Sequence, residues 1–221
     1  MHPPWTTRSG RRGHRERQSI PPLGQARDDG QASLKLEIYL ARHGETAWSL
    51  SGRHTGSTDL SLTPHGEQQA AALKKRLENI QFDAVYSSPL QRATRTAELA
   101  GFPNPQLTPL LREVDYGQYE GMTTTAIREL QPGWELYKDG CPGGESPDQM
   151  YARAVEFLNL FTAVKGRVVA FSHGHFLRLV AAAWMRLDVK AAASLYLDVA
   201  TLSILREDDD HGRVLAVWNA P

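Results

Sequence analysis

Cysteine is almost absent from this chain, since Cys141 is the single one among 221 residues. One thiol cannot form an internal disulfide, and it cannot supply the several thiolates of a cysteine-based zinc site. A chain without disulfides is typical of a reducing compartment. The composition therefore predicts a cytoplasmic protein.

Long hydrophobic runs and an excess of one charge are also absent. No apolar stretch approaches the roughly 20 residues that span a bilayer, and arginines bracket the longest candidate, around 181–184. The 25 basic residues balance 25 acidic ones, so no net field attracts nucleic acid or an anionic membrane. With 41% hydrophobic residues, the chain has the composition of a globular protein without membrane or nucleic-acid partners.

Residues 1–34 differ from the rest of the chain. They are rich in arginine, proline and glycine and show almost no apolar periodicity, so we expect a disordered basic tail. An inert tail, a targeting peptide and upstream sequence included through a wrongly assigned start are the three explanations. Few serines, the acidic residues Glu16, Asp28 and Asp29, and the lack of an apolar core argue against targeting. Residues 35–221 are predicted to form the folded domain.

From residue 36 onward, strand patterns alternate with helix patterns. Capping signals at Thr63-Pro64 and Ser146-Pro147 begin two helices, and Gly101 ends another. Repeated strand–helix units predict a single three-layer α/β/α domain with a mostly parallel central sheet. Strands are expected at 36–41, 84–87, 167–172, 201–206 and 213–218, and helices from 64, over 89–100, from 147 and over 175–185.

Two of these strands end in a histidine followed by glycine. Arg42-His43-Gly44 follows the strand at 36–41, and His173-Gly174-His175 follows the strand at 167–172. Open α/β sheets bind ligands at the carboxyl edge of their strands, and a paired arginine and histidine there suits phosphate. Arg92 lies near a predicted helix N-terminus, which also attracts anions. The pattern predicts a phosphate site at this edge.

Four spaced motifs together resemble the histidine phosphatase superfamily, which includes cofactor-dependent phosphoglycerate mutases and mutase-like acid phosphatases. The motifs are 42–46, 87–93, the segment 111–121 that contains Glu113, and 172–174. The element 143–146, Gly-Gly-Glu-Ser, resembles the phosphatase branch. The resemblance runs from about Leu36 to about Asn219 and is strongest to bacterial acid phosphatases, with sedoheptulose-bisphosphatase-like proteins nearby.

The resemblance implies a role for each core residue. His43 would attack phosphorus to form a phosphohistidine, and neighbouring arginines would favour its reactive neutral form. Arg42, Arg92 and His173 would surround the phosphoryl oxygens, so that no metal ion or other cofactor is needed. Glu113 would protonate the leaving oxygen and then activate water.

Further contacts with the substrate are implied less directly. Ser49 and His175 stand where mutases usually have asparagine: serine leaves more room, and His175 either binds phosphate or caps its helix. The residues expected at the pocket wall are Ser49, Arg53, Thr55, Gly56, Tyr116, Gly174 and His175.

Other polar and aromatic residues receive simpler interpretations. No metal site is expected, because His173 belongs to the phosphate motif and no spacing matches a zinc signature. Glu45 and Glu120 are expected to support loops. The remaining histidines of the domain are expected to face solvent: His54, His65 and His211. Packing and a pocket lid are both open interpretations for Trp48, Trp134 and Tyr137.

The predicted activity is metal-independent hydrolysis of small phosphorylated metabolites, sugar phosphates included. The first alternative is a mutase, but the stretch 121–142 is short, lacks an Arg-Arg pair and carries Thr123-Thr124-Thr125 near the lysine expected there. The second alternative is a catalytically idle binding protein, which usually has a damaged site, whereas every core residue is present here. A homodimer is left open, since dimers occur among the proteins that the chain resembles.

Overall fold

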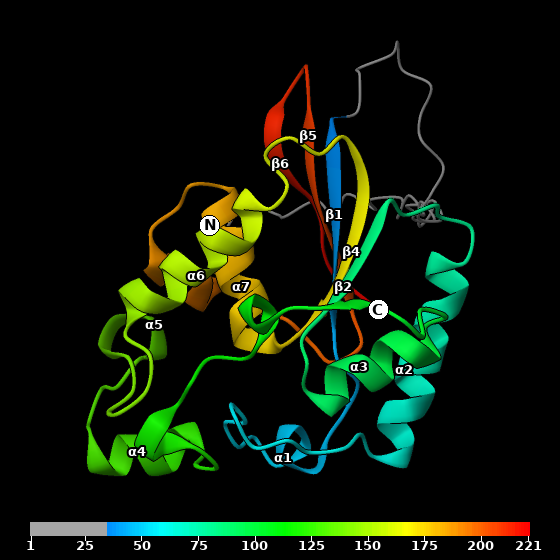
Figure 1. Cartoon of the computed structure of the whole chain (residues 1–221). Coiled ribbons are helices and arrows are strands. Elements are labelled where there is room, and N and C mark those ends of the chain that lie inside the picture. The colour runs from blue at the N-terminus through cyan, green and yellow to red at the C-terminus, as the bar shows by residue number, and fades with distance from the viewer. Residues whose placement is uncertain (1–34) are drawn as a thin grey trace, which may run out of the picture.

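The computed structural model describes residues 35–221, so the expected tail at 1–34 lies outside the described residues. A six-stranded sheet runs through the described part in the order β3-β2-β4-β1-β5-β6 (Figure 1). The strands are β1 (Leu36–Arg42), β2 (Ala84–Ser87), β3 (Gln106–Leu107), β4 (Gly166–Ser172), β5 (Leu202–Asp208) and β6 (Gly212–Ala220). All five predicted strands are confirmed, and β3 is additional.

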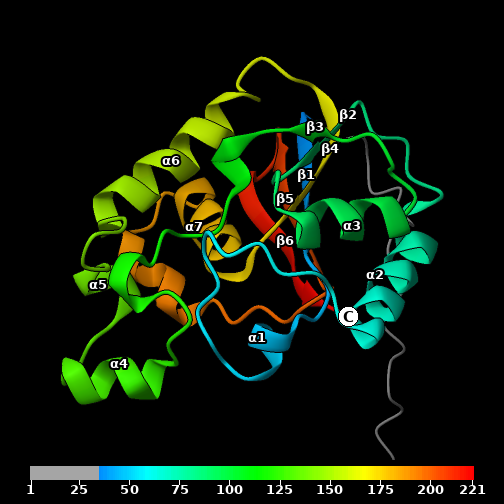
Figure 2. The ribbon, with the colours of Figure 1, turned by 60° about the horizontal axis from the view of Figure 1, so that its bottom comes forward.

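The sheet is mostly parallel, as predicted. β1 pairs with β4 in parallel, and β2 pairs in parallel with both β4 and β3. β5 alone runs opposite to the other strands of this sheet, because its pairings with β1 and β6 are antiparallel. The carboxyl ends of β1, β2 and β4 therefore meet at one edge of the sheet, which faces the viewer in Figure 2.

Helices cover both faces of the sheet, which confirms the α/β/α architecture (Figure 1). Helices α2 (Pro64–Leu77) and α3 (Gln91–Leu99) lie on one face, and α6 (Pro147–Asn159) and α7 (Gly174–Trp184) lie on the other. Side chains of β1 alternate between the two cores: Ile38 packs with the α6–α7 side and Tyr39 with the α2–α3 side. Burying a side chain of this size contributes about 1.5–3 kcal/mol, so both layers stabilise the sheet.

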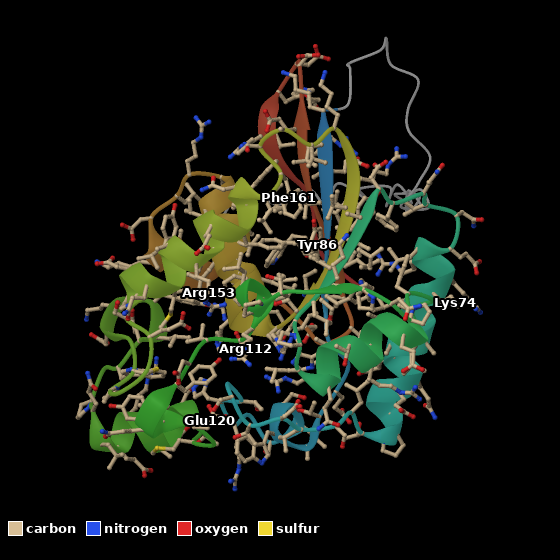
Figure 3. The ribbon with its side chains drawn as sticks, viewed as in Figure 1. Lys74, Tyr86, Arg112, Glu120, Arg153 and Phe161 are labelled. Atoms are coloured by element: carbon tan, nitrogen blue, oxygen red, sulfur yellow. The ribbon has the colours of Figure 1, made fainter. Side chains whose placement is uncertain are left out.

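The predicted helix boundaries rest on caps that the structure contains. The Thr63 hydroxyl accepts a hydrogen bond from Gly66 N at 2.9 Å, and Ser146 forms a capping box with Gln149. Gly101 follows α3 with φ of +100°, a conformation that favours glycine. Phe161, just after the end of α6, packs edge-on against Tyr86 of β2, with ring centroids 5.6 Å apart (Figure 3).

Short elements gather beyond the carboxyl edge of the sheet (Figure 2). They are α1 (Ala47–Leu50), α4 (Thr124–Leu130), α5 (Leu136–Asp139) and the 3-10 helices η1 (Pro109–Leu111), η2 (Gly117–Tyr119) and η3 (Val189–Ser194). These elements are too short to show the apolar periodicity on which a helix prediction depends. No helix in residues 35–221 has both the length and the apolar character to cross a membrane.

Candidate active site

The parallel pairing of β1 with β4 places two histidines side by side. Arg42 and Ser172 are register partners at the ends of these strands, and His43 N donates to Ser172 O at 3.0 Å. The next residue of each strand end is a histidine, and the ring centroids of His43 and His173 lie 5.1 Å apart. The structure thus brings together the two His-Gly steps at one sheet edge.

His43 is buried, and only one of its two ring nitrogens forms a hydrogen bond within the described residues. Its Nδ1 lies 2.7 Å from the carbonyl oxygen of Gly44, and a carbonyl only accepts, so Nδ1 carries the proton and Nε2 keeps its lone pair. Burial, and then the positive charges of Arg42 and Arg92, hold the pKa of His43 well below its usual 6.5. A neutral imidazole with an unshared electron pair on Nε2 is a competent nucleophile.

Arg92 is fully buried in the first turn of α3. Its guanidinium donates to three backbone carbonyls, those of Thr55 at 2.9 Å, Gly56 at 3.0 Å and Thr58 at 2.9 Å. Nε donates to His173 Nδ1 at 3.1 Å. All of these partners are uncharged, so hydrogen bonding fixes the guanidinium without neutralising its charge.

His173 is fully buried and both of its ring nitrogens have partners. Because Nδ1 accepts from Arg92, the proton lies on Nε2, which is 2.8 Å from the Ser88 hydroxyl oxygen and donates to it. Burial, followed by the charge of Arg92, holds the pKa of His173 well below 6.5. A phosphoryl oxygen that contacts this ring would have to share the Nε2 proton with Ser88.

Arg42 supplies a second cation and an unused donor. One terminal nitrogen donates to the Leu197 carbonyl, while Nε is buried with no hydrogen-bond partner among the described residues. The guanidinium packs against Gly174, where a Cβ atom would lie 3.0 Å from Arg42 Cζ. An unpartnered buried donor is costly, and an anion in the adjoining cavity would supply the missing acceptor.

Glu113 is held by the beginning of α7. One carboxylate oxygen accepts from the backbone N–H groups of Val114 at 3.0 Å and Phe176 at 2.9 Å, and the other accepts from His175 N at 3.1 Å. These backbone bonds fix the orientation of the carboxyl group at the wall of a cavity that also contains His43.

Most of the predicted site residues line a cavity of about 240 Å³. Arg92 and His173 are fully buried and do not line it. Gly56 does not line it either, and it supports Arg92 through its carbonyl, while its N–H binds the Glu120 carboxylate at 3.0 Å. The predicted residues that line the cavity are Arg42, His43, Ser49, Arg53, Thr55, Glu113, Tyr116, Gly174 and His175.

The two departures from the mutase pattern have defined partners. The Ser49 hydroxyl donates to Thr46 O at 3.0 Å and accepts from Thr46 N at 2.9 Å, so it completes the capping box in which Thr46 is the N-cap of α1. His175 does not cap its helix through its side chain, because its Nδ1 lies 2.6 Å from the Tyr116 hydroxyl oxygen. Serine and histidine here shape the wall through contacts within the protein.

The prediction that His54 faces solvent is wrong. Its backbone pairs with a distant segment: His54 N donates to Met122 O at 2.9 Å, and Gly121 N donates to His54 O at 2.9 Å. The ring is only 7% exposed and packs on Tyr116 with centroids 4.8 Å apart. Burial lowers the pKa of His54 to about 4. No local pattern marks this long-range pairing.

Several other interpretations can be compared with the structure. His65 and His211 are exposed, as predicted. Glu120 supports a loop, and so does Glu45, which accepts from the Thr63 hydroxyl at 2.7 Å. Trp134 and Tyr137 are buried, whereas Trp48 is half-buried. The cavity residues that the sequence analysis missed are Gly52, His54, Thr124, Arg178, Tyr196 and Leu197.

Metal ligands do not cluster in the described part of the chain. No group of three or more histidine, cysteine, aspartate or glutamate side chains in residues 35–221 could hold a metal ion. The positive charge at the cavity comes from the side chains of Arg42, Arg53 and Arg178.

Comparisons with known proteins identify the family. Residues 38–220 match the family model described as histidine phosphatase superfamily (branch 1). An acid phosphatase of Mycobacterium tuberculosis is 42% identical over 185 residues, covering 81% of this chain and 90% of the relative. Sedoheptulose 1,7-bisphosphatase of Saccharomyces cerevisiae is 33% identical over 211 residues, covering 80% and 77%.

A solved structure has the same fold. The product of an open reading frame of Mycobacterium tuberculosis superposes with a TM-score of 0.79 at 39% identity, covering 83% of this chain and 97% of that chain. The family match extends over nearly all described residues and includes the strand ends that carry His43 and His173. The chain therefore belongs to the histidine phosphatase superfamily.

Proposed function

We propose that this protein is a metal-independent phosphatase that hydrolyses phosphate monoesters of small metabolites, sugar phosphates among them, through a phosphohistidine at His43. The observation that carries the proposal is the neutral His43 ring, with Nε2 unshared, beside the charges of Arg42 and Arg92. The relatives named acid phosphatase and sedoheptulose 1,7-bisphosphatase support hydrolysis of phosphate esters.

In the first step, Nε2 of His43 attacks phosphorus. The nitrogen–phosphorus bond forms as the ester phosphorus–oxygen bond breaks, and the leaving oxygen takes a proton from the Glu113 carboxylic acid. Arg42 and Arg92 stabilise the negative charge on the transferring oxygens, a contribution that positioned cations supply in phosphoryl transfer. The products of this step are an alcohol, a phosphohistidine and a Glu113 carboxylate.

In the second step, water releases phosphate. The Glu113 carboxylate takes a proton from the water, whose oxygen attacks phosphorus while the bond to His43 Nε2 breaks. Inorganic phosphate leaves, His43 returns to its neutral form and Glu113 is protonated again. Acid–base help of this type contributes about 10²–10⁴-fold in rate.

Hydrolysis is favoured over mutase activity by the segment that would clamp a substrate carboxylate. Thr124, which begins α4, lines the cavity near the position where a mutase is expected to have a lysine, and residues 121–142 contain no Arg-Arg pair. A hydroxyl cannot replace the charge of a lysine toward a carboxylate, and the cations of this segment, Arg128 and Lys138, line the neighbouring cavity instead.

The proposal is tested by phosphate release from p-nitrophenyl phosphate and from sugar phosphates, with and without EDTA. We expect hydrolysis that EDTA leaves unchanged, and loss of at least about 10³-fold in kcat for His43→Ala, because the nucleophile is removed. Efficient turnover of 3-phosphoglycerate with a bisphosphate primer and little phosphate release would instead identify a mutase. No turnover of any ester would identify a binding protein.

A further inference from the structure

A second cavity adjoins the one that contains His43. Its volume is about 310 Å³, and it extends toward α4, α5 and η3. Four side chains line both cavities: His54, Thr124, His175 and Arg178. The two cavities are therefore neighbours that share part of their lining.

Positive charge gathers around this second cavity. Arg128, Lys138, Arg178 and Lys190 line it, and Glu135 is its one carboxylate; we call it the basic cavity. None of the four cations forms an ion pair within residues 35–221. Six other cations of the described residues do form ion pairs with carboxylates: Lys35, Arg95, Arg153, Arg167, Arg206 and Arg213.

Arg178 is the cation best fixed in place. Its Nε donates to Ala192 O at 2.8 Å, one terminal nitrogen donates to Ala193 O at 2.8 Å, and the guanidinium lies 5.1 Å from the centroid of the Tyr137 ring. These neutral partners orient the guanidinium without cancelling its charge. Arg92 beside His43 is held in the same manner.

Arg128 repeats the arrangement at another part of the wall. Its Nε donates to the Trp134 carbonyl at 3.0 Å, which leaves its terminal nitrogens without a recorded hydrogen bond in the described structure. Lys138 and Lys190 are exposed, and their long side chains can approach a bound anion from solvent. A phosphoryl group carries more negative charge than a single carboxylate, so it is the better match for several cations around one small cavity.

We propose that the basic cavity binds a second phosphoryl group of the substrate, so that the enzyme prefers bisphosphate esters to monophosphates. This inference rests on the proposed function, because the first phosphoryl group must lie at His43. The substrate class is a sugar bisphosphate or another short bisphosphate that reaches from one cavity to the other. The class of reaction that supplies it forms a bisphosphate ester, and the product is a monophosphate.

The test compares fructose 1,6-bisphosphate with fructose 6-phosphate, which differ by one phosphoryl group. Calorimetry on the full chain carrying His43→Ala measures binding without turnover, and kcat/KM is measured on the unmodified protein. Because charge-assisted hydrogen bonds are strong and tenfold in affinity corresponds to about 1.4 kcal/mol, we expect at least about tenfold preference for the bisphosphate in both measurements.

Two triple variants that each remove three positive charges show where the preference for the bisphosphate arises. Arg128→Gln, Lys138→Gln and Lys190→Gln together should reduce it to about twofold or less, since their charges line the basic cavity. Lys74→Gln, Lys75→Gln and Lys165→Gln remove the same charge from exposed positions that line neither cavity, and should retain the preference. Lys74 projects from α2, away from α4 and α5 (Figure 3).

The outcomes separate this inference from the proposed function. Hydrolysis of p-nitrophenyl phosphate without preference for the bisphosphate would overturn the inference and leave the function standing. Preferential binding without any hydrolysis would overturn the function alone. If 3-phosphoglycerate is preferred over glycerol 3-phosphate as strongly as the bisphosphate over its monophosphate, the phosphoryl assignment is wrong and the cavity recognises a carboxylate equally well.

Discussion

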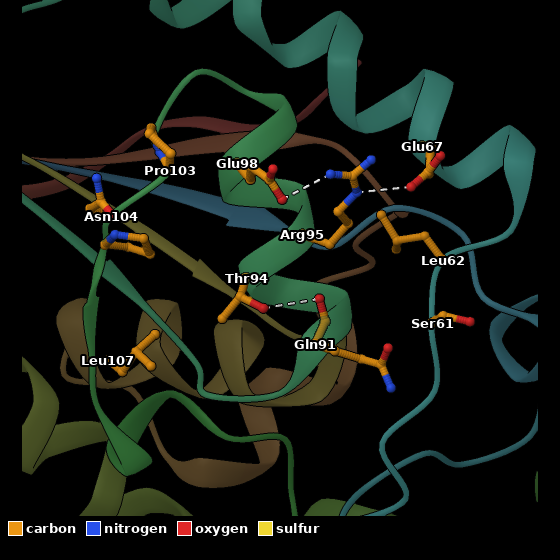
Figure 4. A pocket seen from close by; sticks show the side chains of 11 residues that line it. Ser61, Leu62, Glu67, Gln91, Thr94, Arg95, Glu98, Pro103, Asn104 and Leu107 are labelled. Carbon is orange, nitrogen blue, oxygen red and sulfur yellow. Dashed lines mark hydrogen bonds and ion pairs between the residues drawn. The ribbon is translucent and has the colours of Figure 1, made fainter.

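The large cavity beside α3 and the cavity that contains His43 are both lined by arginine, but the arginines have different partners. The larger, about 670 Å³, lies beside α3, and its only lining cation, Arg95, donates to Glu67 at 2.8 Å and to Glu98 at 2.8 Å (Figure 4). In the smaller cavity at the sheet edge, Arg42 donates to a backbone carbonyl. Carboxylates cancel a guanidinium charge, and carbonyls leave it available. The partners of the arginine therefore identify an anion site better than cavity size does.

The arginines of the two sites also differ in how deeply they are buried. Arg92 beneath the smaller cavity is fully buried, whereas the Arg95 side chain is 41% exposed. Exposed ion pairs contribute about 0–1 kcal/mol, while charges act more strongly where water is excluded. The same reasoning groups the basic cavity with the cavity that contains His43, since Arg178 is held by carbonyls.

Glu113→Gln should lower kcat for an alkyl phosphate by about 10³-fold, because an amide cannot protonate the leaving oxygen. The loss should be smaller for p-nitrophenyl phosphate, whose leaving group is stable as an anion. Steady-state kinetics on both esters measure the difference. Equal losses for the two esters would mean that Glu113 only supports the backbone of α7.

Arg42→Gln should lower kcat/KM by about 10²-fold, the usual cost of removing one donor that stabilises transition-state charge. Its charge is free to act on the phosphoryl group because its recorded partner is the Leu197 carbonyl. Phosphate release from a sugar phosphate measures the loss. If the variant keeps more than about half of the original kcat/KM, an arginine held by backbone carbonyls does not identify the phosphate site.

Acid should destabilise the fold through its buried histidines. Burial lowers the pKa of His54 to about 4 and holds the pKa values of His43, His173 and His175 well below 6.5. Below about pH 6.5 the unfolded chain binds protons at these residues and the native protein does not. Each should therefore reduce the free energy of unfolding by about 1.4 kcal/mol per pH unit until its native pKa is reached.

Urea unfolding at about pH 7.5 and about pH 5.5 measures this dependence. His54→Gln should reduce the slope, since one buried histidine is lost. His65→Gln is the matched control, because His65 is exposed and should leave the slope unchanged. A free energy of unfolding that is the same at both pH values would contradict the neutral state of the buried rings.

Arg95→Gln should have the smallest effect, a change in kcat/KM of less than about twofold, because an exposed ion-paired cation contributes little. It is the counterpart of Arg42→Gln, with the same change of charge in the larger cavity (Figure 4). The same phosphate-release assay applies. A large loss here would assign the larger cavity a part in the reaction.

Strand ends and caps made much of the fold and site predictable. The His-Gly steps at His43 and His173 follow strands whose apolar character is visible locally, and parallel pairing brings their ends together. Thr63 and Ser146 are recognisable as helix starts because the capping interaction lies within a few residues. Information of this kind is local, and a single sequence contains it.

Contacts between distant segments were not predictable in the same way. His54 is buried because its backbone pairs with Gly121 and Met122, more than sixty positions further along the chain. Arg178 lies in a recognisable helix, but the carbonyls that orient it come from η3, a 3-10 helix. The helices α4 and α5 have only seven and four residues, and such short helices depend on tertiary packing.

The most direct test of the account is to trap the covalent intermediate. The unmodified protein is mixed briefly with an ester that carries radiolabelled phosphate, quenched in base and digested. We predict label that is labile in acid and stable in base, on the peptide that contains His43, and no such label on the His43→Ala variant. Rapid hydrolysis with the label on a serine or an acidic residue, or undiminished label in His43→Ala, would contradict phosphohistidine catalysis at this site.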